Sequence, residues 1–249
     1  MTSQPPGRQL PRQEAKSYPL PTGLAKQRAV REMFDTIASR YDLLNAVMSL
    51  GLDGTWRRRC LEHLDLPRGS KVLDVACGTG DLWRGLEQRG MRAVGIDMSV
   101  GMLSRARNAT RLVLGDALAS PLRPASFDGA VSGFALRNVV DLGALFDELA
   151  RVVRPGGRIS LLDLGEPEQL LVRLGHGLWS KHIVPRLGAL LSNASAYEYL
   201  PHSLAYLPPA GEMARLLSKA GFTGTEHVPL SGGISQLYVA TRARATVAL

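Results

Sequence analysis

Acidic residues in this chain stand where short apolar runs end in turns, an arrangement suited to binding a nucleoside. The first run, residues 72–80, reads VLDVACGTG and holds Asp74 ahead of two glycines. A second apolar run ends at Asp97, and a third is followed by Asp116. Glycines allow a sharp turn and a close approach to a ligand, and an acid at a strand tip can accept hydrogen bonds from ribose hydroxyls. This order predicts a nucleoside-binding α/β half-fold.

The residues around the glycines argue against a phosphate-bearing ligand. A dinucleotide fingerprint needs a third glycine where Trp83 stands, and a phosphate loop needs a lysine after its last glycine, whereas Gly80 precedes Asp81. Asp74 and Asp81 flank the turn, so we expect them to repel an anion. A cationic, phosphate-free nucleoside fits better. We therefore predict S-adenosylmethionine, which carries a sulfonium and an ammonium, as the cofactor.

Composition places the chain among ordinary globular proteins. The 249 residues are enough for one α/β domain, and the contents of 45% hydrophobic and 21% charged residues are typical of that class. Cys60, Cys77 and the five histidines show no metal or disulfide spacing, so we predict no metal and a reducing compartment. No apolar run reaches membrane-spanning length, and the proline-rich start lacks a signal-peptide core. We expect a cytoplasmic protein.

The net charge of +8 is spread along the chain, with its tightest run at Arg57-Arg58-Arg59. This run has two interpretations: a solvated helix face, or a contact with anionic lipid, where each basic residue contributes about 1 kcal/mol. The second would make the protein peripheral at the inner face of the membrane.

A helical segment is expected to precede an alternating α/β core. Residues 1–23 are poor in apolar residues and are predicted to be disordered. Apolar residues then recur at helical spacing, which predicts a helical preface over 24–66. Strands are predicted at 71–76, 92–97, 111–115, 128–133 and 157–163, with helices near 80–89, 99–108 and 141–153. This alternation predicts a mostly parallel sheet.

The C-terminal part is expected to add a lid and complete the sheet. Residues 168–207 carry apolar groups without clear strands and are predicted to form a helical lid insertion. A helix to Ala220 and apolar runs at 222–230 and 234–241 predict an antiparallel pair. Residues 242–249 are predicted to be a tail, which leaves a single domain over 24–241.

Several segments of the chain together carry motifs of one protein family. They are residues 33–38, 41–45, 49–51, Trp56-Arg57, 72–81, 95–99, Met102-Leu103, 136–139, 151–158 and 199–203. Over about residues 30–241 the chain resembles the ubiquinone/menaquinone biosynthesis C-methyltransferases. The resemblance implies a class I methyltransferase with a Rossmann-like, seven-stranded, mostly parallel sheet. It also implies transfer of a methyl group from S-adenosylmethionine to a ring carbon of a reduced polyprenyl quinol, converting demethylmenaquinol to menaquinol.

The chain departs from the family pattern at two places. Gly133 stands where the family often has serine, which shifts one cofactor contact onto backbone or water. Asp163-Leu164-Gly165 replaces a common glutamate-phenylalanine-serine sequence on the substrate side.

The resemblance assigns cofactor roles to residues at the strand ends. Asp74 is expected near the methionine amino group, Asp97 at the ribose hydroxyls, and Thr79 at the cofactor, while Gly78 and Gly80 shape the loop. Each polar role has a structural alternative: Asp74 could cap the next helix, and Thr79 could satisfy its own turn.

The adenine end is assigned in the same way. Asp116 is expected to accept a hydrogen bond from the adenine amino group while the Ala117 amide meets a ring nitrogen. Asp116 could instead be an ordinary turn acid. Met98 could line the adenine pocket or fill the core.

Transfer to carbon needs a substrate made nucleophilic by loss of a quinol proton, and therefore a base or a cation near the phenolate. Arg137 is the electrostatic candidate and Asn138 a hydrogen-bonding one, with capping of the next turn as the alternative. Tyr41, Tyr197 and His202 are candidate proton handlers or substrate-wall groups, and histidine titrates near neutral pH. Cys77 could be read as a nucleophile, but a small buried residue is expected there.

Partners follow from the implied substrate. A polyprenyl tail needs an apolar channel, which the leucine-rich residues 170–191 could form, although core packing explains the same pattern. A transient membrane-surface contact is expected, and a homodimer is left open. No nucleic-acid partner is predicted, because residues 133–136 lack the aromatic-proline clamp of enzymes that flip bases. The remaining rivals are methylation of another lipid or secondary metabolite, and a non-catalytic S-adenosylmethionine-binding protein.

Overall fold

The computed structural model describes residues 22–165, 203 and 206–244, and its centre is a seven-stranded sheet in the order β3-β2-β1-β4-β5-β7-β6. Strands β1 to β5 pair in parallel where they are neighbours, and β7 runs antiparallel between β5 and β6. The predicted fold class and its antiparallel C-terminal strand are confirmed. The strands are β1 Lys71–Val75, β2 Arg92–Asp97, β3 Leu112–Leu114, β4 Phe127–Gly133, β5 Val153–Leu164, β6 Phe222–Leu230 and β7 Ser235–Arg242.

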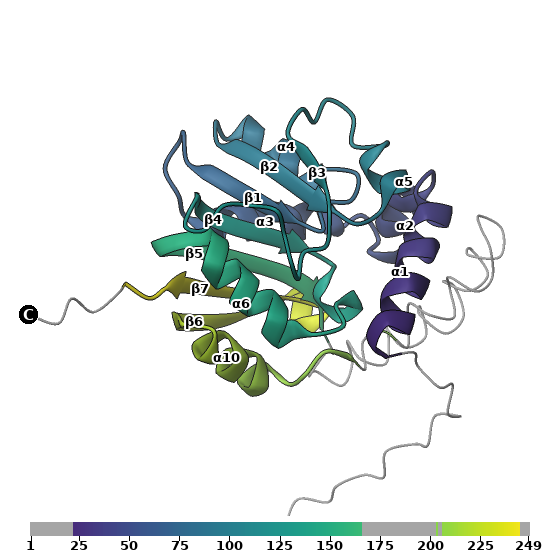
Figure 1. Ribbon diagram of the computed structural model, residues 1–249. Helices are drawn as coiled ribbons and strands as arrows, with labels where there is room; N and C mark the ends of the chain where they lie inside the picture. Colours follow the sequence, from purple (N-terminus) through teal and green to yellow (C-terminus); the bar gives the residue numbers. More distant parts are fainter. Residues whose placement is uncertain (1–21, 166–202, 204–205, 245–249) are drawn as a thin grey trace, which may run out of the picture.

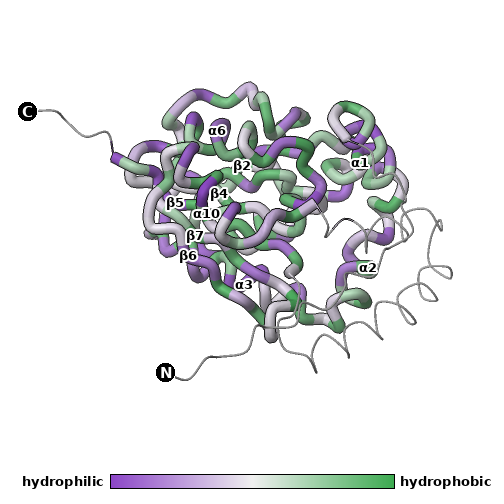
Figure 2. The backbone as a smooth tube through the Cα atoms, turned by 90° about the horizontal axis from the view of Figure 1, so that it is seen from below, coloured by the Kyte–Doolittle hydropathy of each residue, from purple (hydrophilic) through white to green (hydrophobic). Residues whose placement is uncertain are grey.

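Helices cover both faces of this sheet (Figure 1). Helices α3 (Asp53–Leu64) and α4 (Asp81–Gln88) share one core cluster with residues such as Val72. Helices α6 (Leu142–Val152) and α10 (Ala210–Lys219) share the other with residues such as Leu73. Successive strand residues thus face opposite layers, which explains why the central strands read as continuous apolar runs. Figure 2 shows hydrophobic residues along these inner strands.

The predicted helical preface is present as α1 (Gly23–Ile37), α2 (Tyr41–Met48) and α3. Helix α1 crosses the end of the sheet where the parallel strands finish (Figure 1). It buries Val30 and Ile37 on one side, and Ile37 packs in a small cluster with Leu44 of α2 and Met102. The preface therefore covers the edge at which parallel α/β sheets bind ligands.

Two predicted boundaries are wrong for local backbone reasons. The helix expected over 99–108 is reduced to α5 (Val100–Leu103), because the following amides of Arg105 and Ala106 bond to carbonyls three residues back. Asn108 then adopts a left-handed backbone (φ 64) that no helix continues.

Strand β5 begins four residues earlier than predicted, at Val153. It contains Gly156, which takes φ 80, and its register with β4 shifts between Phe127 and Gly129. Gly156 therefore lies within the strand, at an irregularity, rather than before it. The predicted disordered segment 1–23 and lid 168–207 lie almost entirely outside the described residues, and Arg242, assigned to the tail, belongs to β7.

Candidate functional site

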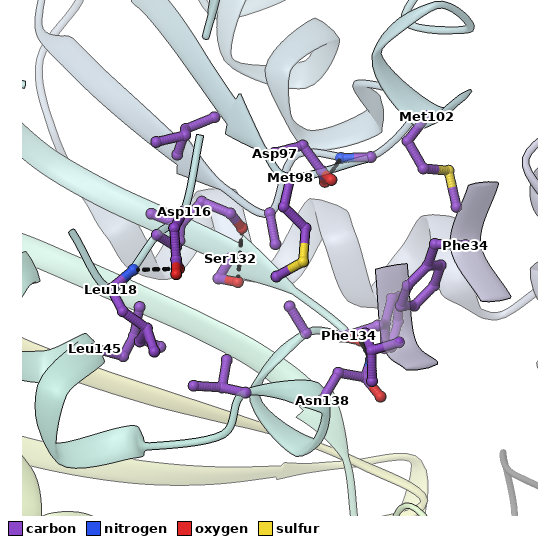
Figure 3. A pocket seen from close by; sticks show the side chains of 18 of the residues that line it. Phe34, Asp97, Met98, Met102, Asp116, Leu118, Ser132, Phe134, Asn138 and Leu145 are labelled. Carbon is purple, nitrogen blue, oxygen red and sulfur yellow. Dashed lines mark hydrogen bonds between the residues drawn. The ribbon is translucent and has the colours of Figure 1, made fainter. Parts of the chain in front are cut away.

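A pocket lies at the carboxyl ends of β1, β2 and β4, closed on one side by α1 and α2. Figure 3 shows side chains from these loops converging on it, with Asp97 and Met98 on one wall and Phe134 and Asn138 on another. The preface contributes four of the lining residues: Gln27, Val30, Phe34 and Tyr41.

The β1–α4 turn is built around Asp97. The Gly78 amide donates to Asp97 Oδ2 and the Ser99 amide to Oδ1, both at 2.8 Å. Gly78 has φ 53 and Gly80, the N-cap of α4, has φ 83, so the loop needs both glycines. Burial raises the pKa of Asp97, although these two amides favour its charged form. Asp97 lines the pocket and retains acceptor capacity towards a ligand.

Asp116 forms the opposite end of the pocket, where Met98 and Ala117 also lie. The Leu118 amide donates to Asp116 Oδ1 at 2.9 Å, which is the turn interaction considered from the sequence. The other oxygen accepts from Gln27 Nε2 of α1 at 2.6 Å. Asp116 therefore has an identified structural partner on each oxygen and still faces the pocket.

Asp74 and Thr79 lie behind the pocket rather than among its lining residues. The Asp74 side chain is fully buried, and neither carboxyl oxygen has a hydrogen-bond partner in the described part of the chain. Burial raises its pKa to about 8. The Thr79 hydroxyl donates to Asp42 Oδ1 of α2 at 2.6 Å, so its identified partner belongs to the preface.

The charge of the pocket favours a cation. Its lining within the described residues includes the carboxylates Asp97 and Asp116 and no lysine, arginine or histidine. The expectation that Asp81 also repels anions is wrong, because Asp81 forms ion pairs with Arg57 (3.1 Å) and Arg84. The argument against a phosphate therefore rests on the two lining acids.

The preface holds each of the loops that shape the pocket. Asp42 bonds the β1 loop through Thr79, and Gln27 bonds the β3 loop through Asp116. Asp35 Oδ1 accepts from the Ser99 hydroxyl (2.5 Å) and the Gly101 amide (2.9 Å) of the β2 loop. Lys26 bonds the β4 loop. Its Nζ donates to the carbonyl oxygens of Arg137 (3.1 Å) and Val139 (2.8 Å).

Helix α3 supports the pocket from the other side through the family's tryptophan-arginine pair. The Trp56 ring meets the Phe134 ring edge-on, with centroids 6.3 Å apart, and the Arg57 guanidinium lies 5.2 Å from the centre of the Phe134 ring. Phe134 itself has φ 61, an unusual backbone for a bulky residue. These contacts hold Phe134 in the pocket wall.

Arg137 is not a free cation at the pocket. It is almost fully buried in the 3-10 helix η1 (Leu136–Asn138), where its guanidinium pairs with Asp163 at the end of β5. The Arg137 amide also donates to Asp163 Oδ2 at 3.1 Å. Asn138 does line the pocket, and its Nδ2 donates to the Phe134 carbonyl at 3.3 Å. Of the two predicted residues, Asn138 is therefore the one that faces a ligand.

Tyr41 lies against the glycine loop, with its ring 3.9 Å from the position that a Cβ on Gly78 would occupy. Burial raises the pKa of Tyr41, which favours the protonated form of its hydroxyl. Tyr197 and His202 lie outside the described residues.

Close packing explains two small residues near the pocket. A Cβ on Gly95 would lie 2.7 Å from the Cys77 sulfur, so these residues fit together, and burial raises the pKa of the Cys77 thiol. A buried, protonated thiol is a poor nucleophile, which agrees with the structural interpretation of Cys77. A Cβ on Gly133 would lie 3.0 Å from Leu82 Cδ1, so a serine at this position would require the Leu82 side chain to shift by a few tenths of an ångström.

Sequence reasoning missed the polar contacts of the preface and the acid partner of Arg137. One signal was available: Lys26 precedes Val30 by four residues, so a charged residue stands on the helix face that is otherwise apolar. Gln27, Asp35 and Asp163 carried no comparable signal, because their partners are far away in the sequence.

Asp74 should make the free protein less stable as the pH rises. Its folded pKa of about 8 exceeds the ordinary value of 3.8, so the folded state binds the extra proton between these values, and stability is lost as the pH rises through this window. We expect Asp74→Asn to remove this loss, which the full shift would put at about 5 kcal/mol by pH 7.5. Urea unfolding from pH 4 to 8 measures it, with exposed Asp65→Asn as the control. Parallel curves for wild type and Asp74→Asn would contradict the assignment.

Comparison with known proteins gives a consistent family. Residues 22–242 match the ubiE/COQ5 methyltransferase family. The chain is 36% identical over 221 residues to the ubiquinone/menaquinone biosynthesis C-methyltransferase UbiE of Syntrophotalea carbinolica, covering 85% of this chain and 93% of that protein. It is 40% identical over 213 residues to the demethylmenaquinone methyltransferase of Roseiflexus castenholzii, covering 82% and 89%.

Solved structures agree on the fold. A Thermotoga maritima SAM-dependent methyltransferase, described as a possible histamine N-methyltransferase, superposes with a TM-score of 0.62 at 17% identity, covering 86% of this chain and 99% of that one. A Haemonchus contortus phosphoethanolamine N-methyltransferase in complex with S-adenosyl-L-methionine also gives 0.62, at 15% identity, covering 86% and 60%. The family match spans nearly all of the described residues and agrees with the topology and the pocket. The chain belongs to the ubiE/COQ5 methyltransferase family.

Proposed function

We propose that this enzyme transfers a methyl group from S-adenosylmethionine to a ring carbon of a reduced polyprenyl quinol, converting demethylmenaquinol to menaquinol. The observation that carries the cofactor assignment is a pocket with two lining carboxylates and no lining lysine, arginine or histidine among the described residues. The family match supports the reaction, and the demethylmenaquinone methyltransferases among its relatives support the substrate.

The residues present fit this cofactor. Asp97 would accept hydrogen bonds from the ribose hydroxyls, and Asp116 would accept one from the adenine amino group. Asp74, buried and without a partner in the described chain, would stabilise the methionine ammonium from behind the loop. Asn138 and the Tyr41 hydroxyl would act as donors near the reacting groups. When bound, the cofactor supplies an electrophilic methyl group on a sulfonium.

The chain's own contribution to the reaction is positioning and charge. The apolar walls, Phe34, Val30 and Leu145 among them, exclude water around the ligands. The Arg137–Asp163 pair fixes the segment that presents Asn138, so we assign Arg137 a positioning role. Holding two reactants in line removes a large entropic part of the barrier.

The experiment that tests the function uses purified enzyme, labelled S-adenosylmethionine and chemically reduced demethylmenaquinol carrying a short prenyl tail. We expect label in menaquinol, and less in a parallel reaction with a benzoquinol lacking the ring methyl group. Faster methylation of the benzoquinol would reverse the head-group assignment. No transfer to either quinol, with cofactor binding intact, would contradict the proposed reaction.

Asp97 should decide cofactor affinity. In Asp97→Asn, one carboxylate oxygen becomes an NH₂ group that must face the Gly78 amide, the Ser99 amide or the ribose. A lost charged acceptor that leaves a buried donor unpaired costs about 1–3 kcal/mol, so we expect affinity for S-adenosylhomocysteine to fall by about fivefold to a hundredfold. Titration calorimetry measures it, with Asp65→Asn as the matched control. Equal affinities of Asp97→Asn and wild type would remove Asp97 from the site.

A membrane contact would give access to a polyprenyl substrate. No helix in the described parts of the chain is long and apolar enough to cross a membrane. The Arg57-Arg58-Arg59 run offers little free charge, because Arg57 pairs with Asp53 and Asp81, and Arg59 with Glu62. Exposed leucines on α2 and the turn after it support a surface contact instead: Leu43, Leu50 and Leu52.

The double variant Leu50→Ser/Leu52→Ser should weaken this contact, because it removes exposed apolar area from the turn. We expect the wild type to co-sediment with vesicles of phosphatidylglycerol and phosphatidylcholine, and the variant to do so several-fold less. Leu114→Ser, which changes an equally exposed leucine on β3, is the control. Unchanged sedimentation of the double variant would place the contact elsewhere.

A further inference from the structure

Lys26 is a buried lysine that none of the proposed chemistry uses. It lies in the first turns of α1 and is only 3% exposed. Its Nζ donates to the carbonyls of Arg137 and Val139, at 3.1 and 2.8 Å, and lies 3.5 Å from the centre of the Tyr206 ring. No ion pair to Lys26 is present among the described residues, so backbone dipoles and one aromatic face are the partners identified for this ammonium.

The position is an expensive one for a lysine. Val30 and Ile37 are the other buried residues of α1, so an apolar side chain at position 26 would continue the same stripe at no desolvation cost. Burial lowers the pKa of Lys26 to about 8, which reflects that cost. Unlike an apolar side chain, the lysine forms directional hydrogen bonds, which fix the positions of the Arg137 and Val139 carbonyl oxygens.

Those oxygens belong to the segment that carries the pocket residue Asn138. Arg137 belongs to the 3-10 helix η1, and Val139 is the extended residue that follows it. By donating to both carbonyl oxygens, the Lys26 ammonium holds the residues on either side of Asn138. The same segment is held from the sheet by Asp163, which binds the Arg137 amide and guanidinium. Lys26 and Asp163 therefore hold η1 from opposite elements.

We propose that Lys26 is a positioning residue for methyl transfer: it ties α1, which forms a wall of the pocket, to η1, and so sets Asn138 relative to the bound substrate. This inference rests on the proposed function. If Lys26 has this role, the loop after β4 reaches its final position only when α1 is docked on the sheet. Tyr206, which precedes α10, also contacts the Lys26 ammonium, so a third part of the chain meets α1 at this point.

The decisive variant is Lys26→Met, which keeps the length and volume of the side chain but removes its hydrogen bonds. The change leaves the Arg137 and Val139 carbonyls without this donor, which opposes the gain from no longer burying a charge, so we expect a stability near that of the wild type. A purely structural lysine predicts either normal turnover or a joint loss of stability, cofactor affinity and kcat. The proposal predicts a stable variant whose kcat falls at least tenfold, while its affinity for S-adenosylhomocysteine stays within twofold of wild type.

Two further variants sharpen the test. Lys26→Arg keeps a cation with several donors and should recover part of the lost kcat. Lys71→Met makes the same change at a lysine that lies 4.5 Å from the centre of the Phe127 ring, at the start of β1 and away from the pocket, and should leave kcat unchanged. Hydrogen exchange of residues 136–140, measured without quinol, should accelerate in Lys26→Met and not in Lys71→Met.

The outcomes separate this inference from the proposed function. Absence of quinol methylation by the wild type contradicts the function, whatever Lys26 does. Wild-type methylation with an equally active Lys26→Met overturns the positioning role. A parallel loss of thermal stability, cofactor affinity and kcat in Lys26→Met also overturns it, because that pattern describes a lysine that only holds the fold together.

Discussion

Carboxyl groups are kept at the pocket without lysine, arginine or histidine beside them in the described lining, and much of the local structure serves this arrangement. Asp97 and Asp116 line the pocket, and Asp74 is buried behind it with no hydrogen-bond partner in the described chain. Burial opposes the ionisation of Asp74 and Asp97 and raises the pKa of both carboxyl groups. Backbone amides at Gly78, Ser99 and Leu118 supply part of the compensation. A cationic ligand would provide further stabilisation of the ionised carboxyl groups, so we expect its binding to favour their charged forms.

The helical preface belongs to this site as much as the sheet does. Parallel strands bring their loops to one edge but do not fix the loops relative to one another. Asp42, Asp35, Gln27 and Lys26 do so, each reaching a different loop from α1 or α2. The α/β core thus brings the loops to one edge of the sheet, and α1 and α2 fix their relative positions, which transfer of a group between two bound reactants requires.

Local patterns in the sequence were sufficient for most of the fold. Continuous apolar runs gave the strands, and the acid-glycine spacing gave the cofactor loop with Asp97 and Asp116 at the pocket. Failures occurred where tertiary contacts decide: the helix after Ser99 ends at Leu103, and Arg137 finds a partner 26 residues away in Asp163. Thr79, which the resemblance assigned to the cofactor, bonds to Asp42 of the preface. Among these residues, only Lys26 carried a signal in the sequence, because a charged residue on an apolar helix face indicates a buried polar partner.

The span of these contacts along the chain has a consequence for the order of folding. Lys26 and Val139 are separated by 113 residues, and the Trp56–Ser231 hydrogen bond spans 175. Closing such long loops costs entropy before any contact repays it, whereas neighbouring βαβ units assemble from nearby residues. Helices α1 and α2, which precede the sheet in the chain, are therefore expected to dock late, onto a sheet that has already formed. Until α1 docks, its apolar side is exposed to solvent. Exposed apolar surface of this kind is what chaperones bind during folding.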